Sequence, residues 1–204
     1  MIVDNVIKKL KENGLYAKKH FGQNFLIDKN VLDKIISISN ITKEDTIIEI
    51  GPGMGCLTEY LAIHSKKVIC YEIDPDMISM LKETLLPLYD NIELIGLDFL
   101  KADLSEYMRN ADNIKVVANL PYYITSPILT ALLEAECFDS VTVMVQKEVA
   151  QRIAAKPGTA DYSAFTVFCQ YYAEPELLFD VPAHCFMPQP KVTSAVITLR
   201  TYKE

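Results

Sequence analysis

Residues 46–55 read TIIEIGPGMG, an apolar run that leads directly into glycines at alternate positions. A short apolar run bounded by glycine and proline indicates a buried strand. Glycine tolerates backbone angles that other residues avoid, and it lets a ligand approach the backbone and the start of a following helix. The stretch therefore predicts a strand, a ligand-binding turn and a helix.

Short apolar runs alternate with helical patterns along the rest of the chain. Because these runs are apolar on both faces, they indicate a mostly parallel sheet covered by helices, an α/β fold. The expected strands lie at 46–50, 68–73, 92–96, 115–119, 141–145, 176–181 and 192–200. The expected helices lie near 56–64, 76–86, 104–109, 126–136, 147–155 and 162–172. Two more amphipathic segments precede them: one over 3–10 that stops at Gly14, and one that begins after Asp28 as N-cap.

The glycine turn does not match the fingerprint of dinucleotide-binding folds, because Cys56 stands where that fingerprint needs a glycine or alanine. The spacing of Gly51 and Gly53, with an acid two residues ahead, suits a nucleoside without a pyrophosphate, such as S-adenosylmethionine. Glu72 follows Gly51 by 21 positions, where a carboxylate would accept hydrogen bonds from both ribose hydroxyls. Asp98, just past the third strand, is placed to accept from an adenine amino group.

Plainer roles compete for some of these acids. Glu72 could be a solvated strand-end acid. Asp74 and Asp76 are typical of turn and capping residues around Pro75. Asp103 is the alternative to Asp98, although a cap for the next helix explains it adequately.

A second motif, residues 119–123 or NLPYY, follows the buried run of the fourth strand. Asn119 offers a side-chain carbonyl as acceptor, and Pro121 keeps Leu120 out of helical geometry, so that the Leu120 carbonyl is free to face a pocket. Tyr122 would supply a stacking face. Two acceptors that converge on an exocyclic NH2 would leave its lone pair facing an electrophile, which suggests N-methylation of a base.

Composition restricts the alternatives. The chain has 204 residues, 50% hydrophobic and 23% charged, as in an ordinary globular domain. The net charge is −7, yet residues 1–34 carry seven lysines against four acids, and they include the cluster Lys18, Lys19 and His20, which is either a solvated face or a basic lip.

The five cysteines never form a C-x-x-C pair, so neither a disulfide framework nor a zinc site is expected. The longest uncharged stretch, 116–133, contains polar residues and prolines unsuited to a membrane, and no signal peptide is visible. We expect a cytoplasmic protein.

Several motifs occur together in a distinctive order. They are FGQNFL at 21–26, EIGPGMG at 49–55, YEID at 71–74, LDFL at 97–100, NLPYYITSPI at 119–128, VQKEVAQRI at 145–153 and FMPQPKVTSAV at 186–196. In this set the chain resembles the ribosomal RNA adenine dimethyltransferases, and in particular their bacterial small-subunit branch. Dim1-type enzymes and erythromycin-resistance methyltransferases are other branches of the family.

The resemblance implies a class I S-adenosylmethionine-dependent methyltransferase fold, Rossmann-like, with seven strands of which the last is antiparallel. It implies a cofactor pocket built from Asn24, Leu26, Gly51, Glu72, Asp98 and Asn119, to which the residues themselves add Gly53. The N-terminal loop would cover the methionine end of the cofactor and become ordered only when ligand is bound. The resemblance also supports the amine-orienting role of Asn119, Leu120, Pro121 and Tyr122. It adds Phe186 as a second aromatic residue near a flipped base.

The implied reaction transfers methyl groups to N6 of two adjacent adenosines in a hairpin loop near the 3′ end of 16S rRNA, on a 30S assembly intermediate. We expect a monomer that uses no metal. Phosphates would be contacted by Gln146, Lys147, Arg152, Lys156, Lys18, Lys19 and Lys191, each of which could equally be a plain surface charge. Tyr171 and Tyr172 are expected to be core or half-buried packing residues.

We divide the chain into residues 1–45, with N-terminal helices and a cofactor-covering loop, and residues 46–204, the Rossmann-like domain. The family's C-terminal helical RNA-binding domain is absent from this sequence. Three alternatives remain open: a 23S rRNA methyltransferase that confers macrolide resistance, a non-catalytic ribosome-assembly factor with the same fold, and an oxidoreductase.

Overall fold

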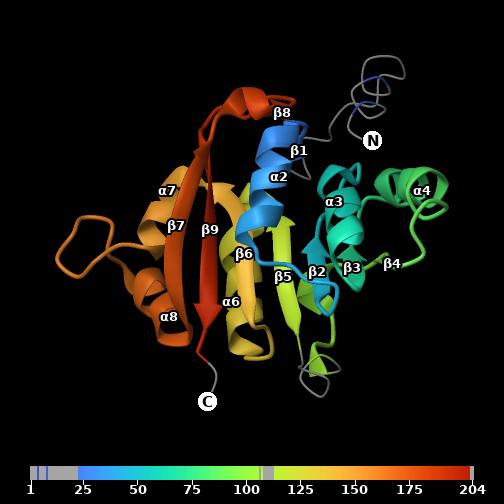
Figure 1. Ribbon diagram of the computed structural model, residues 1–204. Helices are drawn as coiled ribbons and strands as arrows, with labels where there is room; N and C mark the ends of the chain where they lie inside the picture. Colours follow the sequence, from blue (N-terminus) through green and yellow to red (C-terminus); the bar gives the residue numbers. More distant parts are fainter. Residues whose placement is uncertain (1–3, 5–7, 9–22, 106, 108–112, 203–204) are drawn as a thin grey trace.

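The computed structural model describes residues 4, 8, 23–105, 107 and 113–202. The described residues form a seven-stranded sheet flanked by helices (Figure 1). Its strands are β2 (Thr46–Ile50), β3 (Lys67–Tyr71), β4 (Ile92–Ile95), β5 (Ile114–Asn119), β6 (Ser140–Gln146), β7 (Ala173–Val181) and β9 (Ser194–Thr201). The helices are α2 (Lys29–Ile38), α3 (Cys56–His64), α4 (Pro75–Thr84), α6 (Thr125–Glu134), α7 (Lys147–Ile153) and α8 (Ala164–Tyr172).

The strand order is β4-β3-β2-β5-β6-β9-β7. The pairs from β4 to β6 are parallel, and β9 runs antiparallel to both of its neighbours, β6 and β7. The class I methyltransferase fold predicted from the sequence is therefore confirmed, including its antiparallel last strand. The chain leaves β2 in one direction to β3 and β4, then returns to the other side with β5. In open α/β sheets, ligands bind at the carboxyl ends of the strands where the order reverses in this way.

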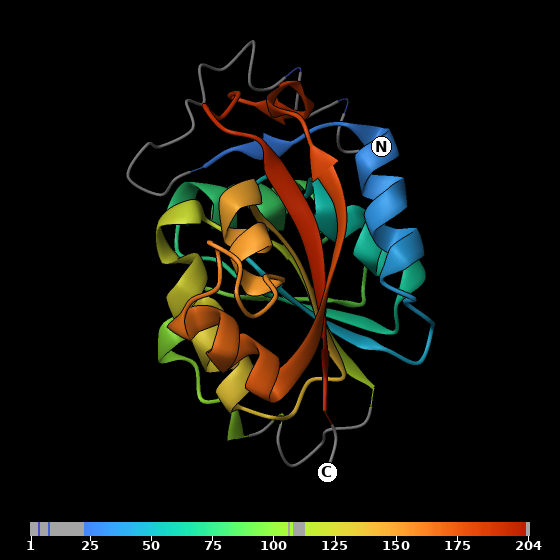
Figure 2. The same cartoon turned by 90° about the vertical axis from the view of Figure 1, so that its left-hand side faces the viewer.

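Helices cover both faces of the sheet (Figure 2). One core lies between the sheet and α2, α3 and α4, and the other between the sheet and α6, α7 and α8. Successive side chains of a strand alternate between the two cores: Ile47 packs in the first and Ile48 in the second, both fully buried. This is why the central strands are apolar on both faces.

Helix starts follow the capping residues in the sequence. Asp28 is the N-cap of α2, and its side chain accepts from the backbone N–H groups of Asn30 and Val31, as predicted. Asp74 caps α4 in the same way, with Pro75 in the first turn. Ser163 forms a capping box with Thr166 at the start of α8.

Some predicted boundaries move, and some predictions cannot be compared. Strand β7 begins three residues before the predicted 176, because β7 lies at the edge of the sheet, where a proline such as Pro175 is tolerated. The helix expected near 104–109 falls mostly outside the described residues, as do the helix over 3–10 and the cluster Lys18, Lys19 and His20.

A two-stranded antiparallel sheet joins distant parts of the chain above the main sheet. In it β1 (Phe25–Leu26) pairs with β8 (Phe186–Met187), so that Leu26 lies opposite Phe186. Ile27 continues the pairing by donating its N–H to the carbonyl of Cys185. The segment after β7 is thereby tied to the segment before α2.

In the part of the chain that the structure describes, no helix is long and apolar enough to cross a membrane. The same residues contain no group of three or more His, Cys, Asp or Glu side chains placed to hold a metal ion. All five cysteines are buried and free.

Candidate active site

A cavity opens at the carboxyl ends of β2, β3 and β5, at the reversal point of the strand order, and it encloses about 970 Å³ when its open mouth is included. Residues of the glycine turn, of the end of β3 and of the NLPYY motif all line it. The two motifs that the sequence suggested separately therefore share one cavity.

The glycine turn adopts backbone angles that require glycine. Gly51 has φ +69° and donates its N–H to the Tyr71 carbonyl at the end of β3. Gly53 has φ +55°, and a Cβ there would lie 2.8 Å from the Phe25 ring. Because Gly53 has no side chain, the Phe25 ring can pack directly against the turn.

Glu72, just past β3, is buried and accepts hydrogen bonds from the backbone around this turn. It is not a solvated strand-end acid. Its Oε2 accepts from Gly53 N at 3.1 Å, and its Oε1 accepts from Ile73 N and Asp74 N at 2.8 and 3.0 Å. Burial raises the pKa of Glu72, although these three N–H donors act in the opposite direction. A carboxylate has roughly four acceptor positions. Three are used, so Glu72 has one left for a ribose hydroxyl, where the sequence suggested two.

Asp98 lines the same cavity and is partly buried. One of its oxygens, Oδ1, accepts from Leu100 N and caps the 3-10 helix η2 (Phe99–Lys101). Tyr123 lies near this acid: burial raises the pKa of its hydroxyl, and the charges of Asp98 and Glu72 raise it further. The sequence predicts that Asp98 contacts the adenine. Tyr123 therefore lies on the side of the cavity where the adenine is expected.

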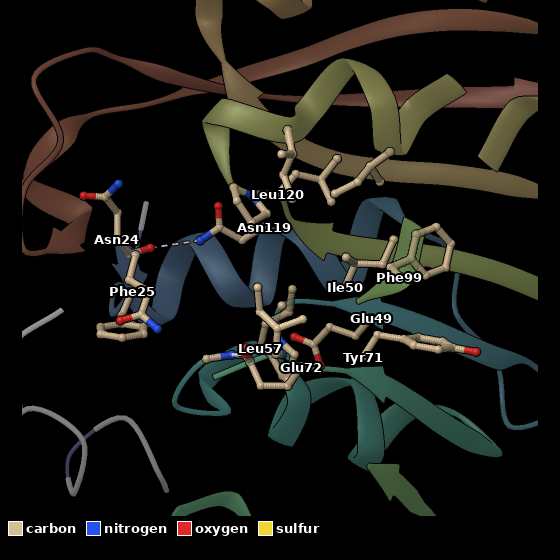
Figure 3. Close-up of a pocket in the computed structure, with 18 of the residues that line it drawn as sticks. Asn24, Phe25, Glu49, Ile50, Leu57, Tyr71, Glu72, Phe99, Asn119 and Leu120 are labelled. Carbon is tan, nitrogen blue, oxygen red and sulfur yellow. Dashed lines mark hydrogen bonds between the residues drawn. The ribbon is translucent and has the colours of Figure 1, made fainter. Parts of the chain in front are cut away.

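Asn119, at the end of β5, is oriented by one hydrogen bond. Its Nδ2 donates to the backbone carbonyl of Asn24 at 3.0 Å, across the cavity from β2 and β3 (Figure 3). Because the nitrogen end of the amide is engaged, the oxygen end is the part of the side chain left to accept from a ligand.

The rest of the motif is held around Asn119. Leu120 is 1% exposed and donates its N–H to the Met144 carbonyl on β6, and among the described residues no N–H donates to its own carbonyl. Pro121 has φ −59° and ψ 129°, and its carbonyl accepts from the Thr125 hydroxyl. The Tyr122 hydroxyl bonds to Ser194 on β9, which leaves the ring in the cavity wall. The structure brings all four predicted residues to the cavity.

The N-terminal segment closes one side of the cavity, where Asn24 and Leu26 both line it. Gln23 extends the attachment by donating from Nε2 to Asp74 Oδ2 at 2.8 Å. The prediction that this loop becomes ordered only with ligand stays a prediction.

Phe186 is the predicted site residue that the structure does not bring to the cavity. Its side chain is 2% exposed and packs in the core beneath α2 and α3, and it is not part of the cavity wall. Because its strand pairs with β1, Phe186 supports the segment that carries Asn24, and its role near a flipped base stays a prediction.

The cavity wall has a one-sided charge. Its ionisable acids are Glu49, Glu72 and Asp98, and among the described residues it contains no lysine, arginine or histidine. Such a wall fits a cationic nucleoside and does not fit a pyrophosphate. S-adenosylmethionine, which carries a positive sulfonium, matches this chemistry.

Sequence reasoning missed three residues of this site. Phe25 covers Gly53, and Tyr123 stands at the mouth with 55% of its surface exposed. The glycine motif contains Glu49 but gives no sign of its position, and in the structure Glu49 is 2% exposed and lines the cavity. Contacts between residues far apart in sequence carry no local signal. The one available hint was that all three fall inside the motifs quoted above.

Comparison with known proteins agrees with this site. Residues 14–204 match the family described as Ribosomal RNA adenine dimethylase. The chain belongs to this family. Among curated members, the Ribosomal RNA small subunit methyltransferase A of Lachnoclostridium phytofermentans is 49% identical over 202 residues, 97% of this chain and 70% of the relative. That of Leuconostoc citreum is 51% identical over 195 residues, 93% of this chain and 66% of the relative. The chain thus spans about two thirds of the length of these family members.

Solved structures of the family have the same fold. A dimethyladenosine transferase from Plasmodium falciparum superposes with a TM-score of 0.76 at 33% identity, covering 86% of this chain and 62% of that one. The 23S rRNA methyltransferase ErmE gives the same TM-score at 32% identity, covering 89% and 71%. Enzymes of the family use S-adenosylmethionine, the cofactor that the charge of the cavity favours.

Proposed function

We propose that this chain transfers methyl groups from S-adenosylmethionine to N6 of two adjacent adenosines in a hairpin loop near the 3′ end of 16S rRNA, giving N6,N6-dimethyladenosine. The observation that carries the proposal is the tethered Asn119 amide, which leaves its oxygen to a ligand in the cavity that Glu72 and Asp98 also line. The names of the family members that are about half identical to this chain support the small-subunit target.

The chemistry needs positioning more than acid–base groups. Adenine N6 is a poor nucleophile because its lone pair is delocalised into the ring. The Asn119 side-chain oxygen and the Leu120 carbonyl would accept its two hydrogens and so draw the lone pair out of conjugation, while the rigid turn at Pro121 keeps both acceptors in place. After transfer the charged amine loses a proton to water, so no general base is assigned.

The cofactor would be held by residues already fixed in the fold. Glu72 has one acceptor position for a ribose hydroxyl, and the turn at Gly51 and Gly53 allows close approach to the backbone. Asp98 keeps its Oδ2 for an adenine amino group. Asn24 and Leu26 would close the methionine end.

The base must leave its stack to enter this cavity, at a cost of a few kcal/mol that is smallest for a loop nucleotide. Phosphate contacts would come from the exposed residues Arg152, Lys156 and Lys191. Lys147 is a weaker candidate, since its Nζ lies 2.6 Å from Asp180 Oδ2. We expect a monomer that acts in the cytoplasm on a 30S assembly intermediate, with residues 1–45 as a cofactor-covering region.

The decisive experiment is incubation with labelled S-adenosylmethionine and unmethylated ribosomal subunits, followed by identification of the modified nucleoside. Label in small subunits, recovered as dimethyladenosine, is the expected result. Label confined to large subunits would replace the proposal with the macrolide-resistance activity, which the resemblance to ErmE keeps as the second candidate. Because the relatives are longer, the assay is run in parallel with a chain extended by a relative's C-terminal region.

A non-catalytic assembly factor and an oxidoreductase are separated by simpler measurements. An assembly factor would bind subunits without incorporating label in either chain. An oxidoreductase would bind NAD in preference to S-adenosylmethionine, contrary to the acidic wall of the cavity.

A further inference from the structure

The cavity contains two buried carboxylates with different surroundings, and both are drawn on its β2–β3 side in Figure 3. Glu72 is held by three backbone N–H groups. Glu49, on β2, is 2% exposed and accepts only a weak donor, the thiol of Cys70, with Sγ 3.6 Å from Oε2. The Thr58 hydroxyl on α3 lies close enough to favour the ionised form of Glu49, yet this buried oxygen has no hydrogen-bond partner among the described residues.

These surroundings favour the neutral acid when no cofactor is present. Burial raises the pKa of Glu49 to about 8, and the charge of Glu72 adds to the effect, against the opposing influence of Thr58 and Cys70. Cys56 on α3 is the other titratable neighbour. Burial raises the pKa of its thiol to about 12 and that of Cys70 well above the usual value, so both stay uncharged.

The described cavity wall contains no cation that could neutralise an ionised Glu49. The proposed cofactor brings one, because its sulfonium is positively charged. Its product, S-adenosylhomocysteine, has the same amino-acid group but a neutral thioether. The two nucleosides therefore differ in the positive charge of the sulfonium. This is the charge that an ionised Glu49 would need as its counter-ion in the buried cavity.

We propose that Glu49 releases a proton to solvent when S-adenosylmethionine binds, and that it takes the proton back once the sulfonium has become a thioether. This inference rests on the cofactor named under the proposed function. Glu49 loses its O–H proton to water, and the Thr58 hydroxyl then turns to donate to the new carboxylate. Glu49 thereby makes the cavity favour the charged donor over the spent product, which assists product release.

The test compares the dissociation constants of the two nucleosides by calorimetry across pH. Both contain the same titrating amine, so the ratio of the constants isolates the sulfonium. In the wild type, the preference for S-adenosylmethionine should rise by about threefold to tenfold per pH unit between about pH 6 and about pH 8, and then level off. In Glu49→Gln, which is neutral at every pH, the ratio should be constant.

Glu59→Gln is the matched control. Glu59 is also a buried carboxylate, 4% exposed, but it bonds to the Tyr89 hydroxyl and does not line the cavity, so this variant should keep the wild-type slope. A constant ratio in the wild type, or a wild-type slope in Glu49→Gln, would overturn the inference. Failure of both nucleosides to bind the wild type would instead remove the cofactor assignment itself.

A second measurement needs no variant. With ¹³C-labelled glutamate carboxyls, one resonance should titrate near pH 8 in the cofactor-free protein and with S-adenosylhomocysteine. The same resonance should show an ionised carboxylate down to about pH 6 with S-adenosylmethionine. If the three spectra titrate alike, Glu49 does not exchange a proton with binding.

Discussion

Asn119 divides its amide between structure and chemistry. The nitrogen end is anchored to the Asn24 carbonyl, and the oxygen end is left to accept. An amide can do this because it carries a donor and an acceptor at fixed positions, whereas a carboxylate carries acceptors only. The residue type was therefore readable from the sequence, but its anchor 95 positions away was not.

Replacing Asn119 by alanine should lower methyl transfer by about 100-fold or more, because an acceptor aimed at the reacting amine is lost. Cofactor affinity should fall much less. Asn119→Asp is the companion variant: it keeps oxygens but loses the donor to Asn24, so it should be impaired as well. Single-turnover transfer and calorimetric binding measure the two effects, and unimpaired transfer in the alanine variant would contradict the role.

Gly53 and Gly158 form a matched pair, because both have positive φ but only Gly53 is crowded. Gly53→Ala should weaken S-adenosylmethionine binding by about tenfold or more, since the new Cβ would displace the Phe25 ring. Gly158→Ala, with nothing within 4 Å, should lower stability by roughly 1 kcal/mol and leave affinity unchanged. Equal affinities in the two variants would show that the contact with Phe25 does not matter.

At the scale of elements, a buried ion pair joins the start of β2 to β5. Asp45 Oδ2 lies 2.9 Å from Lys115 Nζ, and their side chains are 4% and 16% exposed. The same carboxylate accepts from the backbone and hydroxyl of Thr42. Burial acts to raise the pKa of Asp45, but the hydrogen bonds from Lys115 and Thr42 outweigh it and hold the pKa below 3.8.

Lys115→Met should destabilise the fold by about 2–3 kcal/mol at neutral pH, somewhat less than for a fully buried pair because Lys115 is partly exposed. The exposed pair Lys67–Glu93 is the control, and Lys67→Met should cost less than about 1 kcal/mol. Urea denaturation measures both, and similar losses would contradict the importance of burial.

The pH dependence of the same pair has a definite sign. Because the folded pKa of Asp45 is depressed, its contribution is fully present above the unfolded value and is lost as the pH falls through the folded pKa. The stability difference between wild type and Asp45→Asn should therefore be constant from about pH 7 to about pH 5 and shrink below about pH 4. Denaturation curves over this range test it, and a difference that grows in acid would refute it.

The elements also show where sequence patterns stop being informative. The central strand β2 was predicted to the residue, and the strands β5 and β6 to within one residue at each end, because burial on both faces leaves a continuous apolar run. The burial of the Phe186 side chain and the exposure of the Tyr171 side chain were not predicted from the sequence. Phe186 is covered through the pairing of β8 with β1, and Tyr171 is 76% exposed on α8 although a packing role was predicted for it. Tyr172, its partly buried neighbour, fits that prediction. Single aromatic residues carry no periodicity to show which way they face.

At the scale of the whole molecule, the cavity is built from the carboxyl ends of three strands and from the N-terminal segment, so a bound cofactor should stabilise all of them together. S-adenosylmethionine at 100 times its dissociation constant should add about 2.7 kcal/mol and raise Tm by about 5–11 °C. NAD at the same concentration should leave Tm unchanged. Differential scanning calorimetry measures both, and a larger shift with NAD would argue for a dinucleotide site.

The position of β9 has a consequence for how the protein is made. This strand comes from residues 194–201, yet it lies between β6 and β7, both of which are synthesised earlier. Until β9 has left the ribosome, β6 has an open edge and β7 has no partner in the sheet, so the sheet cannot be completed before this strand is made. A ribosomal RNA-modifying enzyme would thus carry an unfinished sheet until residue 201 has been made, with the edge of β6 open to mispairing.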